Sequence, residues 1–132
     1  MKYLILIFTL LIGAQAQAAP DITTHHYPAV VTSVYDGDTI TVDIELGLSV
    51  ILKAQKIRLH RINAPEMRGD EREEGTLSRD YLRDRILGEK IILETLADKR
   101  GKYGRLLGEI WLEKTNINDE LVSLGLAVFK QY

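Results

Sequence analysis

A strict alternation of apolar and polar residues at positions 39–45, preceded by a two-residue turn, constrains the fold of this chain most. The apolar members of the alternation are Ile40, Val42 and Ile44. Because successive side chains of a strand point to opposite faces, the pattern predicts a strand with one buried face. Positions 30–35 are rich in β-branched residues and predict another strand. Asp36 and Gly37 between them favour a tight turn, so the two strands should form a hairpin.

A third strand is expected to begin near Lys56 and to change register before it ends. Leu59 lies on its apolar side, but the next apolar residue, Ile62, falls on the opposite parity. A bulge or bend at residues 60–61 would produce this change, and bulges often re-aim side chains near active sites. Pro65 then ends the strand, because proline cannot donate a ladder hydrogen bond.

The spacing of apolar residues becomes helical after a charged loop at residues 67–74. The pattern predicts a helix of three to four turns that ends at Gly88, a natural C-terminal cap. Two more strands are expected at residues 90–96 and 105–112, and Asn118 is expected to cap a short helix after them.

These elements comprise five short strands, a helix between the third and fourth, and a short C-terminal helix. The expected fold is therefore mainly β (α+β), with the five-stranded OB-fold, a small Greek-key barrel, as its architecture. A generic α+β sandwich is the alternative, because periodicity indicates which elements form and not how they are joined.

Residues 1–18 have the pattern of a cleaved signal peptide. An apolar run at residues 3–12 is followed by small residues, and the run is too short to cross a bilayer. We expect cleavage after Ala18, a flexible lead-in at residues 19–28 and one domain at residues 29–132. The alternative is a buried N-terminal helix or strand. Export predicts a secreted or periplasmic protein without a membrane anchor, and we expect a monomer.

Charge and cysteine content limit the chemistry that the chain can perform. The formal net charge is −2, which does not suit a protein that coats nucleic acid by bulk attraction. Basic residues do gather at positions 53–61 and 99–105, although such groups more often form a solvated strand face. The chain has no cysteine, which excludes disulfides and thiolate metal sites.

Asp38 is the first residue that indicates a functional site. It shares the parity of the buried positions that follow it, and a carboxylate on the buried side of a strand needs a partner. A cation or an arginine would serve, and the nearby Asp36 favours a cation. The alternative is that both aspartates only shape the turn.

Two further groups of polar residues follow. Arg58 lies on the third strand, and Glu66 follows the strand's end; an arginine can clamp a phosphate, and a glutamate can take a proton from water. Tyr103 and Arg105 come just before the last strand, where the tyrosine could stack on a base and the arginine could hold a phosphate. Taken singly, Arg58 and Glu66 would also suit an ordinary solvated surface.

Four short motifs together resemble the staphylococcal nuclease family, also called thermonuclease-like proteins. They occur in the family's order and cover the chain from Val30 to its end. The motifs are Asp36, Gly37, Asp38 and Thr39; Arg58 and Leu59 with residues 62–66; Lys102, Tyr103, Gly104 and Arg105; and Asn118 with residues 120–122 and 125–127. Each motif is weak alone, but four in order are specific.

The resemblance implies an OB-fold nuclease that cleaves DNA and RNA at the 5′-oxygen bond and leaves 3′-phosphate ends. It assigns the catalytic roles to Arg58, Glu66 and Arg105, the metal site to Asp36, Asp38, Asn63 and the carbonyl of Ala64, and substrate contacts to Lys102 and Tyr103. Ca²⁺ is the expected cation, with Mg²⁺ or another divalent ion possible, because the ligands are all oxygens.

Asn63 departs from the family pattern, which has a second aspartate ligand at this position. The substitution removes one negative charge, so metal affinity should fall or ion preference should change. The alternative function is a catalytically inactive OB-fold module that binds nucleic acid or protein, which Asn63 and the acidic net charge favour.

Overall fold

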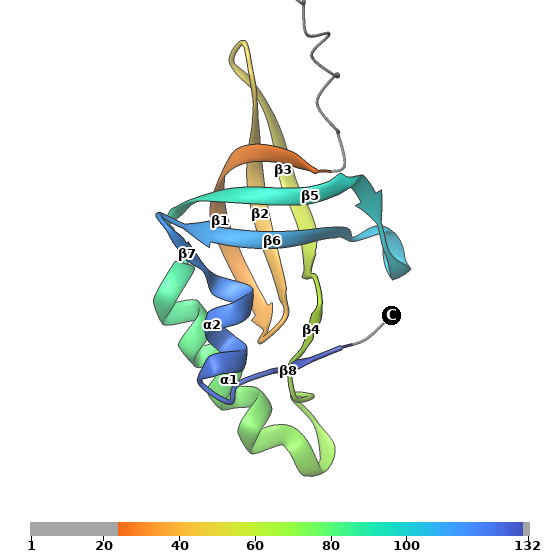
Figure 1. Ribbon diagram of the computed structural model, residues 1–132, viewed down its shortest axis with the longest axis vertical. Helices are drawn as coiled ribbons and strands as arrows, with labels where there is room; N and C mark the ends of the chain where they lie inside the picture. The colour runs from red at the N-terminus through yellow and green to blue at the C-terminus, as the bar shows by residue number, and fades with distance from the viewer. Residues whose placement is uncertain (1–23, 131–132) are drawn as a thin grey trace, which may run out of the picture.

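Five long strands close into a barrel in the computed structural model, which describes residues 24–130 (Figure 1). They are β1 (His25–Asp36), β2 (Thr39–Gly47), β3 (Val50–Leu59), β5 (Lys90–Arg100) and β6 (Leu106–Leu112). Antiparallel pairing follows the order β3–β2–β1–β5–β6, and parallel pairing of β3 with β6 closes the ring. This mixed barrel confirms the predicted five-stranded OB-fold and excludes the sandwich.

Two α-helices, two short 3-10 helices, η1 (Gly69–Glu71) and η2 (Lys102–Gly104), and three short strands complete the described part of the chain. The α-helices are α1 (Arg72–Ile86), between β3 and β5, and α2 (Ile117–Ser123), near the C-terminus. The short strands are β4 (Ile62–Asn63), β7 (Thr115–Asn116) and β8 (Val128–Phe129). β7 pairs with β6, while β4 and β8 pair with each other outside the barrel. The chain that follows α2 is thereby tied to the segment that follows β3.

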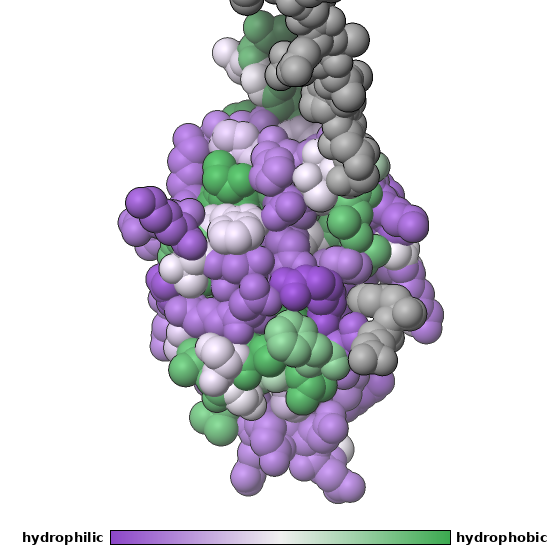
Figure 2. Space-filling view, in the orientation of Figure 1, coloured by the Kyte–Doolittle hydropathy of each residue, from purple (hydrophilic) through white to green (hydrophobic). Residues whose placement is uncertain are grey.

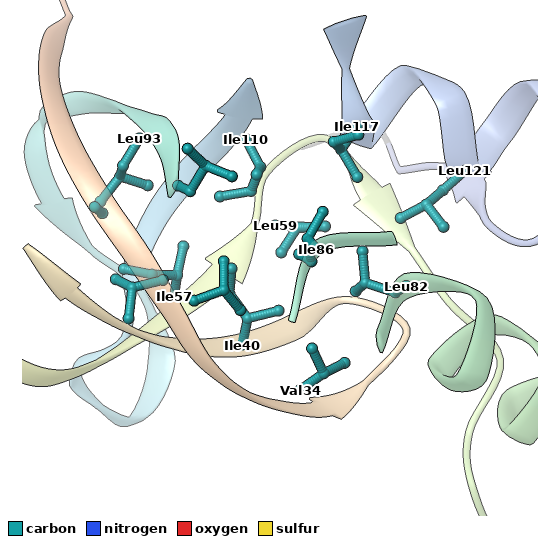
Figure 3. Packing of buried hydrophobic residues seen from close by; sticks show 14 of the residues in the cluster. Val34, Ile40, Ile57, Leu59, Leu82, Ile86, Leu93, Ile110, Ile117 and Leu121 are labelled. Atoms are coloured by element: carbon teal, nitrogen blue, oxygen red, sulfur yellow. The ribbon is translucent and has the colours of Figure 1, made fainter. Parts of the chain in front are cut away.

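The core lies inside the barrel and continues under both helices. Ile40, from β2, and Leu59, from β3, are fully buried, as the period-two pattern predicted. Figure 3 shows Leu82 and Ile86 of α1 and Leu121 of α2 pointing toward the same interior. Burial of these apolar side chains is the main favourable contribution to folding, and it holds the helices against one end of the barrel.

The expected change of register after β3 is confirmed as a turn at His60 and Arg61. Arg61 adopts a left-handed conformation, with φ of 66°, and the chain then continues as β4. Asn118 holds this turn from α2: its Nδ2 donates to the carbonyl of His60 at 3.0 Å and to that of Gly108 at 3.1 Å, and its Oδ1 accepts from the amide of Ile110 at 3.1 Å. Asn118 is therefore a buried cross-link.

The prediction that Asn118 caps the short helix is wrong. The cap is Asn116, whose side chain accepts from the amide of Asp119 at 3.1 Å. The apolar Ile117 between these two asparagines is fully buried, which turns Asn118 inward as well. Sequence position alone could not distinguish the cap from the buried cross-link.

Several element boundaries also differ from the predicted ones. Residues 25–28, expected in the flexible lead-in, belong to β1 and pair with β5. β3 starts at Val50, and β5 continues to Arg100. α1 begins at Arg72, because Glu73 and Glu74 suit the positive end of a helix even though they add nothing to its apolar face. The predicted signal peptide and residues 19–23 lie outside the described residues.

Most of the visible surface is hydrophilic, and apolar residues gather over the protruding end of the β2–β3 hairpin (Figure 2). The exposed apolar residues of this end are Leu46, Leu48, Val50, Ile51 and Leu52. Within residues 24–130, neither helix combines the length and the apolar composition that crossing a bilayer would require.

Candidate active site

Asp38 lies in the β1–β2 turn with its side chain directed inward, as its parity predicted. Only 10% of this side chain is exposed. Its Oδ2 accepts a hydrogen bond of 2.8 Å from the amide of Ala64, which joins the turn to the segment after β4. The amide of Asp38 in turn donates to Oδ1 of Asp36 at 3.0 Å. The two aspartates are thus held side by side, with the Asp38 carboxylate inside.

The electrostatic setting of Asp38 is unusual for a carboxylate. Burial raises its pKa to about 6, and the nearby Asp36 charge adds to this effect. The Ala64 amide and the Arg58 guanidinium act in the opposite direction, but they do not offset the loss of hydration. The buried carboxylate is therefore short of positive charge, a condition that a bound cation would relieve.

Arg58 is held rigidly beside Asp38. Its Nη1 donates to the carbonyl oxygens of Leu59 at 2.7 Å and Ile62 at 3.0 Å. Its Nη2 donates to Oδ1 of Asn63 at 3.1 Å and lies 3.3 Å from Oδ2 of Asp38. Leu59 and Ile62 lie on either side of the turn after β3. The change of register therefore places their carbonyl oxygens where the Arg58 guanidinium can donate to them.

Arg105 reaches the same site from the start of β6. Its Nη1 donates to Oγ1 of Thr39 at 3.3 Å, and Thr39 donates to Oδ1 of Asp38 at the same distance. The hydroxyl thus lies between Arg105 and the Asp38 carboxylate. Tyr103 lies beside them, 81% exposed, with Cζ of Arg105 at 5.5 Å and Nζ of Lys102 at 5.0 Å from the centre of its ring.

Close packing against α1 fixes the segment that carries Ala64. A Cβ atom on Gly37 would lie 2.7 Å from the Cβ atoms of both Ala64 and Ser78, so only glycine lets the β1–β2 turn approach the helix. The Ser78 hydroxyl donates to the carbonyl of Leu126 at 2.5 Å, which also ties α1 to the chain after α2. The turn, the segment after β4 and α1 meet at one end of the barrel (Figure 1).

Glu66 lies on the exposed surface at this end, and its backbone is held in place. Its amide donates to Oε2 of Glu71 at 2.9 Å. A Cβ atom on Gly75 would lie 2.2 Å from the Glu66 carbonyl oxygen, so the first turns of α1 press directly against the Glu66 backbone. Glu66 is therefore positioned by a helix that begins six residues after it.

The structure brings most of the predicted site residues together. Asp36, Asp38, Arg58, Asn63 and Ala64 form one connected network, and Arg105 joins it through Thr39. Lys102 and Tyr103 flank Arg105, while the Glu66 side chain leaves the same segment as Ala64. Sequence reasoning missed four supporting residues: Thr39, Glu71, Gly75 and Ser78. Only Thr39 was quoted in a motif; the other three have no local signal, because their partners come from tertiary packing.

The donor set fits a hard divalent cation. Two carboxylates, Asp36 and Asp38, lie together with the amide oxygen of Asn63 nearby, and all of these atoms are oxygens. Within residues 24–130 no group of three or more His, Cys, Asp or Glu side chains is placed to hold a metal ion, so the ligand set that the resemblance implies also needs the Asn63 amide and the Ala64 carbonyl. Ca²⁺ or Mg²⁺ suits such oxygen ligands, and a bound cation would add to the stabilisation that Arg58 already gives the buried Asp38 carboxylate.

Comparison with known proteins agrees with this geometry. The family described as staphylococcal nuclease homologue matches residues 56–132, which include Arg58, Glu66 and Arg105. The chain belongs to the staphylococcal nuclease family. The hairpin that carries Asp36 and Asp38 precedes the matched region, but it lies in the same hydrogen-bonded network as Arg58.

Curated relatives of this nuclease family member are found in several bacteria. Endonuclease YhcR of Bacillus subtilis is 34% identical over 123 residues, which cover 86% of this chain and 10% of the relative. The thermonuclease of Staphylococcus hyicus is 32% identical over 105 residues, 77% of this chain and 59% of the relative. An uncharacterized endonuclease of Haemophilus influenzae is 34% identical over 103 residues, 77% of this chain and 52% of the relative. The chain spans less than two thirds of the length of each of these three.

Proposed function

We propose that this protein is a metal-dependent nuclease that hydrolyses phosphodiester bonds of DNA and RNA. The observation that carries the proposal is the convergence of Asp38, Arg58 and Arg105 at one end of the barrel, next to the segment that bears Glu66. A binding module would have no need for a buried carboxylate held between two arginines. The family membership and the endonuclease and thermonuclease names of the relatives agree with this reading.

The two arginines bind the phosphate that is to be cleaved. As water adds to phosphorus, negative charge accumulates on the phosphoryl oxygens, and guanidinium groups fixed beforehand stabilise that charge without having to reorganise. Arg58 is fixed by four acceptors, so it meets the phosphate already oriented. Arg105 has a weaker bond to Thr39, at 3.3 Å, which a phosphate oxygen can replace.

Glu66 takes the proton of the attacking water. Its carboxylate is exposed and its backbone is braced by Glu71 and Gly75, which suits a base that must reach a substrate bound outside the barrel. The bond from phosphorus to the 5′ oxygen then breaks, and the products carry 3′-phosphate and 5′-hydroxyl ends. Tyr103 and Lys102 contact the nucleotide beside the cleaved bond.

Asp38 and Asp36, with Asn63 and the carbonyl of Ala64, would hold the cation, and we propose Ca²⁺ first. A bound divalent cation supplies Lewis-acid polarisation of the phosphoryl oxygen. Because Asn63 is neutral, affinity should be weaker than in a site with a third carboxylate, and Mg²⁺ or another divalent ion remains a candidate.

We further propose that the protein is exported to the periplasm or the medium and acts as a monomer. The support for export is the N-terminal pattern of an apolar run at residues 3–12 followed by small residues. The absence of cysteine is compatible with an oxidising compartment, because no thiol is present to form a wrong disulfide.

The decisive experiment compares wild type with Glu66→Gln in the hydrolysis of single-stranded DNA with Ca²⁺. Loss of a general base should lower the rate about 10²- to 10⁴-fold. The matched control is Glu73→Gln. Glu73 is an exposed glutamate on α1, the helix that packs against the Glu66 backbone, and this variant should retain activity. Thermal unfolding should show that both variants are folded, and chelator should abolish wild-type cleavage.

The second candidate function, an inactive OB-fold binding module, is favoured by Asn63 and by the net charge of −2. It predicts binding of single-stranded DNA without cleavage under any divalent cation. Activity that survives both Glu66→Gln and chelator would refute the proposed mechanism.

A further inference from the structure

A hollow on the outer face of the barrel adjoins the candidate active site. Asp36, Thr39 and Arg105, which belong to that site, line one part of it. Tyr35, Thr41, Lys56 and Tyr103 line the rest. The hollow is therefore continuous with the place where the cleaved phosphate would bind, and it lies along β1, β2 and β3.

Tyr35 lines this hollow from the end of β1, next to a β-bulge. The register of the β1–β2 ladder passes from Val34 opposite Ile40 to Asp36 opposite Thr39, which leaves Tyr35 as the extra residue. Val34 is buried, whereas Tyr35 is 75% exposed. A large aromatic ring that is exposed to solvent contributes little to the core. Core packing therefore does not account for a tyrosine at this position.

Tyr103 lines the same hollow from the segment before β6, where its backbone is also irregular. Its φ of 62° is a left-handed conformation that few non-glycine residues adopt, and its ring is 81% exposed. Two exposed tyrosines from distant parts of the chain thus line one hollow.

Lys56 places a positive charge in line with Arg58. The two residues are two apart on β3 and lie on its outer face, where Lys56 is opposite Thr41 and Arg58 is opposite Thr39. Two steps along a strand separate their Cα atoms by about 7 Å. The lining of the hollow contains a single carboxylate, Asp36, which already belongs to the proposed cation site.

We propose that this hollow is a binding subsite for the nucleotide next to the cleaved phosphate in a single-stranded chain. The base stacks on Tyr35 and Tyr103, and Lys56 contacts the flanking phosphate. Aromatic rings beside cationic side chains are the usual means of binding single strands, because every base has a face on which a ring can stack. In a duplex those faces are covered by neighbouring bases, so the subsite selects unpaired nucleic acid. The assignment rests on the proposed function for the position of the cleaved phosphate.

The test of Tyr35 measures binding of a short fluorescent oligothymidine by anisotropy, in the presence of chelator so that no cleavage occurs. Tyr35→Ala should raise the Kd about tenfold, within the range measured for loss of one stacking contact. Tyr35→Phe keeps the stacking face and should bind as wild type does. Equal affinity of wild type and Tyr35→Ala would overturn the proposal.

The test of Lys56 uses the salt dependence of the same binding. A lysine that contacts phosphate in a single strand contributes about 0.7 to the slope of log K against log salt concentration. Lys56→Gln should reduce the slope by that amount, whereas Lys114→Gln, an equally exposed change in the β6–β7 turn, should not. An unchanged slope in Lys56→Gln would exclude the phosphate contact.

The proposed function is tested separately by wild-type hydrolysis of a mononucleotide nitrophenyl diester with Ca²⁺. This substrate has no flanking nucleotide, so its cleavage does not depend on the hollow. Oligothymidine binding with the predicted effects, together with no cleavage of the diester or of DNA, would support the subsite and reject the nuclease.

Discussion

Arg58 lies near the end of β3 and Arg61 lies three residues later, in the turn that follows this strand, and both pair with a carboxylate. Nε and Nη2 of Arg61 bind the two oxygens of Glu109 at 2.5 and 3.0 Å, and Nη2 also reaches Asp119 at 2.8 Å. Arg58 lies 3.3 Å from one oxygen of Asp38 and gives its other bonds to neutral oxygens. The first arrangement is called the Arg61 cluster below, and the second the Arg58 cluster.

The two clusters differ in how completely their charges are balanced. Hydrogen bonds to Glu109, and secondarily to Asp119, raise the pKa of Arg61 above its ordinary value, so this guanidinium is fully matched. In the Arg58 cluster burial keeps the pKa of Asp38 at about 6 despite the adjacent guanidinium. The matched Arg61 cluster joins the turn after β3 to β6 and α2 and stabilises the fold. In the Arg58 cluster the buried Asp38 carboxylate keeps a raised pKa, and a bound cation would stabilise its charged form. By this criterion Arg58 is a functional arginine and Arg61 is a structural one.

The largest expected effect in this comparison is the loss of activity in Arg58→Gln. Removing one preorganised donor to developing charge should lower the rate of DNA hydrolysis about 10²- to 10³-fold. Arg61→Gln, assayed below its melting temperature, should stay within a few-fold of wild type. Steady-state cleavage of single-stranded DNA measures both, and equal losses in the two variants would break the distinction between the clusters.

Asp38→Asn should stabilise the metal-free protein at neutral pH. The folded-state pKa of about 6 lies above the ordinary value of 3.8, so folding above pH 6 must desolvate a charged carboxylate. The penalty, on the order of 3 kcal/mol, is relieved as pH falls through 6 and is absent below 3.8. Urea unfolding with chelator should therefore show a more stable variant at pH 7 and little difference near pH 3.5. A destabilised variant at pH 7 would show that Asp38 is already adequately paired.

Arg61→Gln should lower the free energy of unfolding by about 2 kcal/mol, because Glu109 is then left with fewer partners in a mostly buried position. Nδ2 of Asn116 still donates to Glu109 at 3.1 Å, which limits the loss. The measurement is urea unfolding at neutral pH. Glu109→Gln with Arg61→Gln should recover part of the stability, since no buried charge remains unpaired.

The smallest effect is expected for Arg85→Gln, a third arginine that pairs with a carboxylate. Its Nε lies 3.1 Å from Glu120, and 23% of this glutamate side chain is exposed, against 11% for Glu109. Pairs this exposed contribute about 0.2–1 kcal/mol, so thermal unfolding should shift by only a few degrees. A loss as large as that of Arg61→Gln would mean that bond geometry and burial do not rank these arginines.

Much of the fold could be predicted from residue patterns. The hairpin at Asp36 and Gly37, the turn after β3 and the helix that ends before Gly88 all follow from local periodicity and turn chemistry. The start of α1 and the start of β1 could not, because residues 72–76 and 25–28 show little apolar periodicity and gain their order from neighbouring elements.

The prediction of site residues was also restricted to properties that a local sequence pattern can carry. The parity of Asp38 showed that its carboxylate is buried, and the family motifs pointed to Arg58 and Arg105. The roles of Thr39, Glu71 and Gly75 depend on contacts between segments that are distant in sequence or on the path of a loop. No local pattern separates Arg58 from Arg61, since each is followed directly by an apolar residue and the two lie only three residues apart.

The sequence by itself determined which segments become strands and helices, which side of each strand is buried, and which oxygen and guanidinium groups are available. Those properties depend on neighbours one to four residues away, and the chain carries them directly. The tertiary structure alone decided that the β1–β2 turn meets the Ala64 segment and α1, and that Tyr35 and Tyr103 line one hollow. Barrel closure brings these segments together, and closure depends on the packing of the whole core.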